Sequence, residues 1–248
     1  MEKRCFALLI FVSLLMAQPA VAGETVVLVS NEYVPYVNTS ARTQGFLSEV
    51  VIAAFAEVGV EARVEFRPWR RCAMLVETGE VLGAFPYAVT ERREEYAWFS
   101  DQIWVCRNVF FYLKGRMADF DYTRLEDLRD MRIAGTSGNY YEDIFKEARL
   151  KVDYAPGEAS GIRKIWEMRS DLFAEDELVG WNLISQLFPG RKSMFGSTPT
   201  PWNMNSQHVM ISKKYPESEA LMKRFNHGLE NIRINGVYAG ILSRYKKE

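Results

Sequence analysis

The chain has 248 residues, of which 48% are hydrophobic and 25% are charged, and its formal net charge is −1. This composition is typical of a globular protein with one large hydrophobic core or two modest ones, and it excludes a disordered chain. The near-neutral charge does not suggest a nucleic-acid partner, which would require a basic face.

The first 22 residues are typical of a secretory signal peptide. Lys3 and Arg4 precede an apolar run over residues 5–17, and Ala-Val-Ala at residues 20–22 resembles a cleavage site. We expect cleavage after Ala22 and an exported mature chain with a formal charge of −2, because the removed segment carries a net +1. No later stretch of the sequence is long and apolar enough to cross a bilayer.

Apolar periodicity predicts alternating strands and helices along the mature chain. In the first half we expect strands at residues 25–30, 60–66, 81–89 and 103–113, and a helix from Gly45 to a C-cap at Gly59. In the second half we expect a strand at 132–135, a helix ending at Leu150, a helix at 161–169, a strand at 207–212, and two helices within 217–245.

Residues 83–100, which read GAFPYAVTERREEYAWFS, contain the strongest candidate for a ligand contact. An apolar run leads into a turn with Thr90 and Arg93, and an aromatic segment follows. The planar guanidinium of an arginine matches a carboxylate with two parallel hydrogen bonds. The alternative is a solvated charged turn with no binding role.

This segment resembles the type II periplasmic solute-binding proteins of the polar-amino-acid-binding group. Their usual pattern is Gly-x-Thr-x-Thr-x-x-Arg, followed seven residues later by the Ser of Phe-Ser, which places the carboxylate-binding arginine on Arg93. Pro86 and Ala88 stand where the family has Gly and Thr, while Thr90 matches. The resemblance therefore implies an anion contact and lacks part of the usual cradle for an α-amino acid.

Further candidates in the first half follow the predicted strands. Glu32, Tyr33 and Tyr36 come after the first strand, and ligands in α/β proteins bind beyond the carboxyl ends of strands. Tyr33 matches an aromatic position of the family. These aromatic residues could equally pack on their own part of the protein.

Trp69, Arg71 and Tyr87 are the remaining candidates of this half. Trp69 and Arg71 open the next helix, and the resemblance places Arg71 where related proteins stack an aromatic ring on the ligand. If Arg71 and Arg93 both face the cleft, the ligand should carry more than one anionic group. The alternative is a surface tryptophan with solvated arginines around it.

In the second half, two segments match ligand-binding positions of the family. Ser137 and Gly138 match a turn that binds the ligand carboxylate, although Asn139 replaces the usual hydroxyl. A helix start favours anions, but small polar residues also cap most helices. Asp176 matches the acid that binds the ligand ammonium, with Glu175 as a neighbouring candidate; acids here could also serve only to compensate a helix dipole.

The resemblance covers nearly the whole mature chain and implies its architecture. We expect an α/β, two-lobed periplasmic-binding-protein type II fold, in which each lobe is a mixed, mostly parallel sheet flanked by helices. Residues 23–104 and 208–248 would form lobe 1, residues 105–207 would form lobe 2, and two hinge strands would connect them. The implied partners of the monomer are an amino acid or related carboxylate and a membrane permease of the ABC type or a receptor.

The sequence supports no metal, cofactor or enzyme chemistry of its own. It has no phosphate-binding glycine loop, nucleophile elbow or Cys-x-x-Cys, and we expect His208 and His227 to be structural. Cys72 and Cys106 could form a disulfide in an oxidising compartment or remain free and buried. Two alternatives to uptake are a periplasmic sensor and a lyase resembling cyclohexadienyl dehydratase, in which Glu175 or Glu32 would act as the acid.

Overall fold

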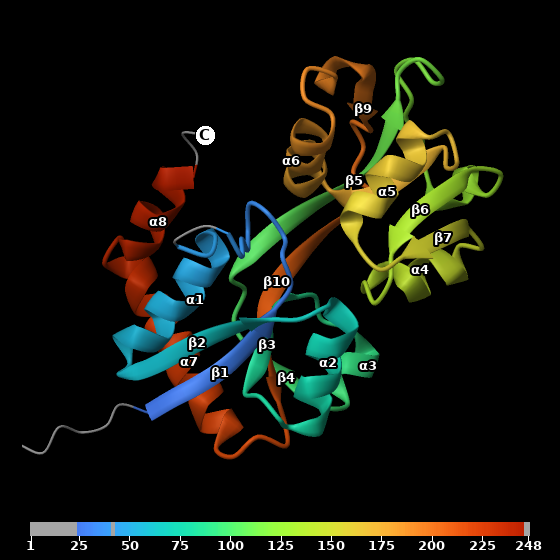
Figure 1. Ribbon diagram of the computed structural model, residues 1–248. Helices are drawn as coiled ribbons and strands as arrows, with labels where there is room; N and C mark the ends of the chain where they lie inside the picture. The colour runs from blue at the N-terminus through green and yellow to red at the C-terminus, as the bar shows by residue number, and fades with distance from the viewer. Residues whose placement is uncertain (1–23, 41–42, 246–248) are drawn as a thin grey trace, which may run out of the picture.

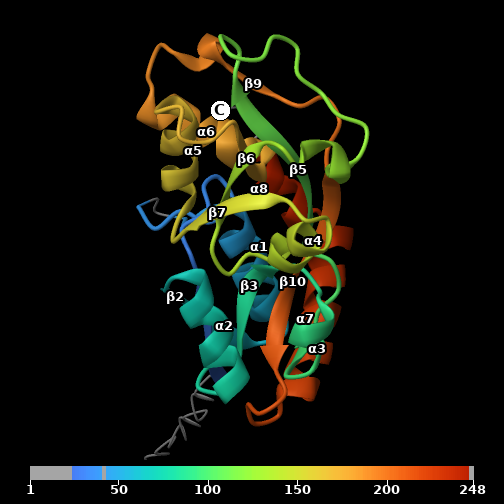
Figure 2. The ribbon, with the colours of Figure 1, turned by 90° about the vertical axis from the view of Figure 1, so that its right-hand side faces the viewer.

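The structure is a computed structural model that describes residues 24–40 and 43–245. The expected signal peptide lies outside these residues. The chain forms two lobes, each with its own sheet, joined by two long strands (Figure 1), and Figure 2 shows the two lobes after a quarter turn. Within the described residues, no helix combines the length and apolarity needed to cross a membrane.

Lobe 1 contains a sheet whose strand order is β2-β1-β3-β10. Strands β1 (Glu24–Ser30), β2 (Val60–Phe66) and β3 (Gly83–Tyr87) are parallel, whereas β10 (Asn203–Ser212) is antiparallel to β3 and to the short β4 (Ala97–Phe99). Because side chains alternate along a strand, Leu28 packs in the core under one face of the sheet and Val29 in the core under the other.

Four of the helices cover the sheet of lobe 1. Helices α1 (Phe46–Glu57), α7 (Ser218–Ile234) and α8 (Val237–Tyr245) enclose the larger core, and α2 (Trp69–Thr78) covers the opposite face. A single turn, α3 (Glu91–Glu94), connects β3 with β4. The two helices predicted within residues 217–245 correspond to α7 and α8, so this prediction is confirmed.

Lobe 2 contains a sheet with the order β5-β8-β6-β7. Strands β6 (Arg132–Thr136), β7 (Lys151–Ala155) and β8 (Leu172–Asp176) are parallel, and β5 (Trp104–Leu113) is antiparallel to β8 and to β9 (Phe195–Ser197). Helices α5 (Glu158–Trp166) and α6 (Glu177–Leu187) pack on one face and α4 (Tyr141–Glu147) on the other. Two short 3-10 helices span Leu125–Leu128 and Lys192–Met194.

Strands β5 and β10 pass from one lobe to the other. Residues 203–207 of β10 pair with residues 104–108 of β5, and residues 208–212 of β10 pair with lobe 1 strands β3 and β4. The lobe boundaries expected between residues 104 and 105 and between residues 207 and 208 lie within β5 and β10. These boundaries stay a prediction until hinge motion is measured. The fold class predicted from the sequence, α/β with two lobes and mixed sheets, is confirmed.

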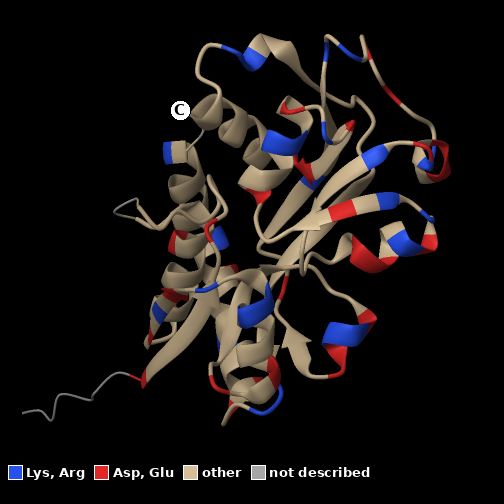
Figure 3. Cartoon of the chain, turned by 45° about the vertical axis from the view of Figure 1, so that its right-hand side comes forward, with Lys and Arg blue, Asp and Glu red and all other residues tan. Residues whose placement is uncertain are grey.

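Some predicted elements differ from the structure: the strand expected at residues 81–89 spans 83–87, and the one expected at 207–212 begins at 203. The helix expected at residues 161–169 spans 158–166, because Gly157 ends the preceding loop in an extended conformation and the helix starts directly after it. Strand β7 was not predicted, because its sequence, KVDYA, has only a short alternation. Basic and acidic residues are interspersed over the helices and strands of both lobes (Figure 3).

Candidate functional site

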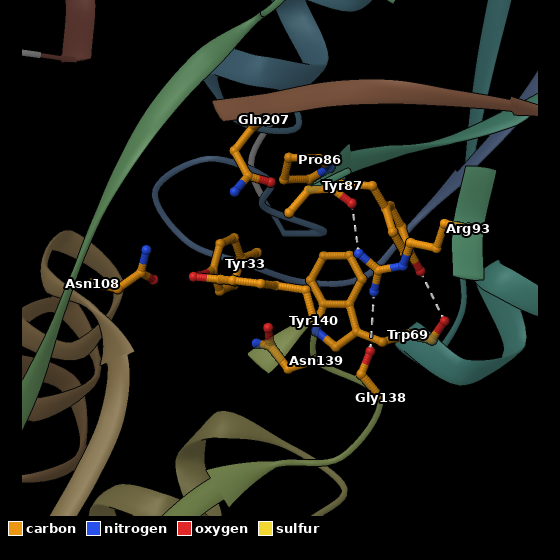
Figure 4. Close-up of a pocket in the computed structure, with 11 residues that line it drawn as sticks. Tyr33, Trp69, Pro86, Tyr87, Arg93, Asn108, Gly138, Asn139, Tyr140 and Gln207 are labelled. Carbon is orange, nitrogen blue, oxygen red and sulfur yellow. Dashed lines mark hydrogen bonds between the residues drawn. The ribbon is translucent and has the colours of Figure 1, made fainter. Parts of the chain in front are cut away.

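A small cavity lies between the two lobes (Figure 4). The space in it that the centre of a water molecule can reach has a volume of about 40 Å³. Lobe 1 contributes six lining residues: Tyr33, Trp69, Pro86, Tyr87, Ala88 and Arg93. They come from three places in the sequence, the loop after β1, the start of α2, and the segment from the end of β3 to α3. The carboxyl ends of these strands thus form one wall, as expected for an α/β fold.

Arg93 is the cation of this wall. Thr90 caps α3 by accepting a hydrogen bond from the Arg93 backbone N–H at 3.3 Å, which fixes the start of the turn. The guanidinium donates from Nη1 to the Ala88 backbone oxygen at 2.8 Å and from Nη2 to the Gly138 backbone oxygen of lobe 2 at 3.4 Å. It lies 4.7 Å from the centre of the Tyr87 ring.

The charge of Arg93 has no counter-ion among the described residues. Arg93 contacts two backbone oxygens, the face of the Tyr87 ring and the Tyr96 side chain, and no carboxylate of the described chain lies within ion-pair distance. Burial lowers the pKa of its guanidinium. Arg93 is half-buried, and a partly desolvated cation without a counter-ion attracts an anionic group, so this end of the cavity suits a carboxylate.

Three aromatic rings form a row that leads away from Arg93. The Tyr87 and Trp69 rings meet edge to face with centroids 5.5 Å apart, and the Trp69 and Tyr33 rings do the same at 5.6 Å. The Tyr87 hydroxyl donates to the Trp69 backbone oxygen at 2.8 Å, which fixes the start of α2 against β3. These rings offer flat apolar surface with polar tips to a small ligand (Figure 4).

The opposite wall comes from lobe 2 and the connecting strands. Gly138, Asn139 and Tyr140 line the cavity from the turn between β6 and α4, and Asn108 and Gln207 line it from β5 and β10. Gly138 has a φ of 83°, a left-handed conformation that glycine adopts readily. The three carboxamides place both donors and acceptors around the cavity without adding charge.

Two carboxyl groups of lobe 2 contact the far end of the aromatic row. The Trp69 indole Nε1 donates to Glu158 Oε1 at 2.9 Å, and the Tyr33 hydroxyl donates to Glu175 Oε1 at 2.9 Å. Glu158 is 9% exposed and Glu175 is 1% exposed. Burial raises the pKa of both carboxyl groups, and their proximity to each other raises that of Glu175 further.

Asp176 lies behind this layer and does not line the cavity. It is 1% exposed, and its Oδ1 accepts from the backbone N–H groups of Leu178 and Val179 at 3.0 and 3.1 Å, so it caps α6. The same oxygen accepts from the Tyr36 hydroxyl at 3.0 Å. Burial raises the pKa of Asp176 to about 6. Asp176 Oδ1 thus serves as the helix cap. The predicted contact between Asp176 and a ligand amine stays a prediction.

The structure brings five of the ten predicted site residues to the cavity: Tyr33, Trp69, Tyr87, Arg93 and Gly138. Thr90 acts as the cap of α3 and lines two neighbouring grooves. Asp176 acts as the cap of α6.

The other three predicted residues lie elsewhere. The Ser137 backbone N–H donates to Ala155 O at 2.7 Å and thereby extends the pairing of β6 with β7. Glu32 is exposed, accepts from the Thr39 hydroxyl at 3.0 Å, and lines a separate groove. Arg71 is exposed on α2 and contacts Met74 Sδ, so the structure does not bring it beside Arg93.

Several lining residues were not chosen from the sequence. Asn108 and Gln207 are 4% and 7% exposed. Asn108 stands within a largely apolar strand, where an amide is a signal for a specific contact, whereas the polar sequence around Gln207 gives no such signal. Glu158, which does not line the cavity but accepts from the lining residue Trp69, was missed because the helix that begins with it was predicted to start three residues later. Tyr140 follows the identified turn directly and could have been found by extending it.

Cys72 and Cys106 are both free and buried, so they do not form the disulfide that the sequence left open. Burial raises the pKa of Cys72 to about 12 and raises that of Cys106 well above its ordinary value. In the part of the chain that the structure describes, no cluster of three or more His, Cys, Asp or Glu side chains is placed to hold a metal ion.

A sequence comparison with known families matches residues 25–248 to the bacterial extracellular solute-binding proteins, family 3. This match covers nearly the whole described chain. In a comparison with curated proteins, no sequence matches this chain.

Solved structures with the same fold include proteins of different activities. A histidine kinase sensor domain with similarity to periplasmic binding proteins has a TM-score of 0.79 and 17% identity, over 90% of this chain and 96% of that one. An ancestral arginine-binding protein bound to arginine has a TM-score of 0.75 and 18% identity, over 89% and 97%. The ancestral amino acid-binding protein AncCDT-1, a precursor of cyclohexadienyl dehydratase, has a TM-score of 0.72 and 18% identity, over 89% and 94%.

Proposed function

Because the chain belongs to the bacterial extracellular solute-binding proteins, family 3, we propose that it captures a small polar solute, an amino acid or related carboxylate, for ABC-type uptake. The observation that carries this proposal is the guanidinium of Arg93, which is at the interlobe cavity, contacts both lobes and has no counter-ion among the described residues. A ligand carboxylate would supply that counter-ion.

The proposed mechanism is closure of the two lobes on the ligand, with no covalent bond made or broken. Arg93 would hold the carboxylate from lobe 1, and the Gly138–Tyr140 turn and the carboxamides would complete its polar contacts from the other side. Trp69 and Tyr33 would cover its apolar part. Such a ligand favours the closed form because only that form makes both sets of contacts.

The cellular setting of this proposal rests on family membership and on the N-terminal sequence. We place the mature protein in the periplasm after cleavage at Ala22, as a monomer that delivers its ligand to a membrane permease. The related sensor domain keeps a signalling role open, in which a membrane receptor would be the partner. Uptake and signalling are distinguished by measuring uptake of the identified ligand in cells with and without the gene. A transport role predicts that uptake is lost without the gene, and a signalling role predicts that uptake is unchanged.

The first test is a thermal unfolding screen of the protein purified from the periplasm. The screen should include amino acids, their 2-oxo and 2-hydroxy analogues, and dicarboxylates. A compound that binds only the folded protein raises stability by about 2.7 kcal/mol at a hundredfold excess over its Kd. We expect at least one carboxylate to raise Tm, and no shift with any carboxylate would contradict the proposal.

A second candidate function is a lyase, and Glu175 is the observation that favours it. A general acid needs a raised pKa to carry its proton near neutral pH, and burial gives the Glu175 carboxyl group such a pKa. Its proton could be given to a leaving hydroxyl of a cyclic carboxylate held at Arg93. Turnover of prephenate or arogenate by the wild type and its loss in Glu175→Gln would support this function, whereas absence of turnover would leave binding alone.

A further inference from the structure

The two lobes are linked by hydrogen bonds that end on carboxyl groups. Trp69 of lobe 1 donates to Glu158 of α5, and Tyr33 of lobe 1 donates to Glu175 of β8. We call Glu158 and Glu175 the acid pair. Separation of the lobes would break both bonds and admit water to both carboxyl groups.

The titratable groups that the structure places around the acid pair are acids, tyrosines and a thiol. The titratable groups that face Glu175 are Tyr33, Cys106, Tyr140, Tyr141, Glu158 and Asp176. Those that face Glu158 are Glu32, Tyr141 and Glu175, with the Trp69 indole as its donor. The buried cation of α5, Lys164, is bound instead by Asp153 at 2.7 Å. Among the described residues, no lysine or arginine forms an ion pair with the acid pair.

Ionisation of this pair in the closed protein is unfavourable for two reasons. Burial removes the water that would stabilise a carboxylate, and two like charges in one low-dielectric region repel each other. Glu175 Oε2 is also buried with no hydrogen-bond partner among the described residues. These effects raise the pKa of both groups above the ordinary glutamate value of 4.5 in the closed protein.

We propose that Glu158 and Glu175 form a proton-binding site that couples lobe closure to pH. Proton uptake by the acid pair holds the cleft closed without ligand at acidic pH, and proton release lets it open as the pH rises. The proposal does not depend on the identity of the ligand or on the uptake role, because every contact in it is within the chain.

The direction of the effect follows from the change in pKa. In an open protein the carboxyl groups would face water and their pKa values would return toward the ordinary glutamate value, whereas burial in the closed protein raises the pKa of both groups. The stabilisation of the closed form is fully present below the open-state pKa and is lost as the pH rises through the closed-state pKa. Between these two values, each proton taken up changes the ratio of closed to open protein by about tenfold per pH unit.

The experiment measures the distance between the lobes at different pH values. Spin labels would be attached to cysteines introduced at Glu57 on α1 and Glu126 in lobe 2, both of which are exposed. The native Cys72 and Cys106 are buried and should not react with the label. Ligand is first removed by unfolding and refolding. We expect one short distance at pH 5, and a longer distance whose population increases toward pH 9.

Neutral variants separate the acid pair from other sources of pH dependence. The double variant Glu158→Gln, Glu175→Gln keeps acceptors for Trp69 and Tyr33, but these two positions can no longer titrate. We therefore expect the distance to change with pH much less than in the wild type. The acid that remains at this boundary is Asp176, which accepts from the Tyr36 hydroxyl of lobe 1 at 3.0 Å. The matched control is Glu142→Gln, because Glu142 also reaches across the lobes but is paired with Arg70 at 3.1 Å. This control should retain the wild-type change with pH.

A third variant tests the donor side without altering the acids. Trp69→Phe keeps a ring and removes the indole N–H, so the population of the short distance at pH 5 should decrease. Each variant is first compared with the wild type by circular dichroism, and the single variants Glu158→Gln and Glu175→Gln replace the double variant if it does not fold. A pH-independent distance in the wild type, or an unchanged pH response in the neutral variants, would overturn the proposal.

Discussion

Arg93 of lobe 1 reaches the backbone oxygen of Gly138 in lobe 2, with 3.4 Å between Nη2 and that oxygen. This distance is long for a hydrogen bond, whereas the bond from Nη1 to Ala88 O in its own lobe is 2.8 Å. The guanidinium is therefore positioned by lobe 1 and only weakly engaged by lobe 2. It retains donors for a ligand that enters between the lobes.

We predict that Arg93→Lys weakens ligand binding by about 10- to 100-fold, because lysine keeps the charge but loses the planar pair of donors. The affinity is measured by calorimetry with the carboxylate that gives the largest Tm shift. Arg92→Lys is the matched control, since Arg92 is the exposed neighbour on the same turn and should bind as the wild type does. Equal affinities for both variants would remove Arg93 from the site.

Tyr87 allows the hydrogen bond and the aromatic face to be tested separately. Tyr87→Phe removes the bond to Trp69 O and should lower the free energy of unfolding by about 0.5–1.5 kcal/mol, while the ring remains under Arg93. Tyr87→Leu also removes the cation–π contact, which contributes about 0.5–2 kcal/mol, and should weaken ligand binding further. Urea unfolding and calorimetry on both variants measure the two effects. If the Tyr87→Leu and Tyr87→Phe variants bind the ligand equally well, the ring has no role in holding Arg93.

Individual strands and helices could be predicted from the sequence because their signals are local, whereas the two-lobed architecture was implied by the resemblance to the family. The β-branched run at 25–30 and the helical spacing between Gly45 and Gly59 each appear as strand and helix within one residue of the expected ends. Arg93 was found for a similar reason, since its position is fixed by a short motif that ends at Ser100. Short periodic segments thus carry enough information to place elements, and the family motif was enough to place Arg93 at the interlobe cavity.

The rest of the site could not be read from local pattern, because it depends on contacts between distant segments. Tyr33 and Glu175 are 142 residues apart, and Trp69 and Glu158 are 89 apart, yet each pair is joined by a hydrogen bond. The acid series around Asp176 suggested a helix start, but only the fold shows that Asp176 caps α6 while Glu175 points to Tyr33. Burial decides these roles, and the sequence does not specify burial for a single acid.

The two thiols provide a prediction that is independent of the ligand. Cys72 and Cys106 are buried and free, and their raised pKa values keep them protonated at neutral pH. We expect the protein purified from the periplasm to react negligibly with a thiol reagent when native, and to release two thiols per chain in guanidinium. A reducing agent should leave Tm unchanged. Zero thiols after unfolding would show that the cysteines pair.

The helix contact that supports lobe 1 can be tested at Gly228. A Cβ added to Gly228 of α7 would lie 2.0 Å from the Ala54 backbone oxygen of α1, so the two helices would have to separate. We predict that Gly228→Ala lowers the free energy of unfolding by about 1–3 kcal/mol, despite the higher helix propensity of alanine.

Gly240→Ala in α8 is the matched control for this contact. A Cβ at Gly240 would meet no atom within 4 Å, so only the helix propensity changes, and we expect an increase of up to about 1 kcal/mol. Urea unfolding of both variants measures the difference. If the two substitutions had the same effect, the close approach of α1 and α7 would not limit the residue at position 228.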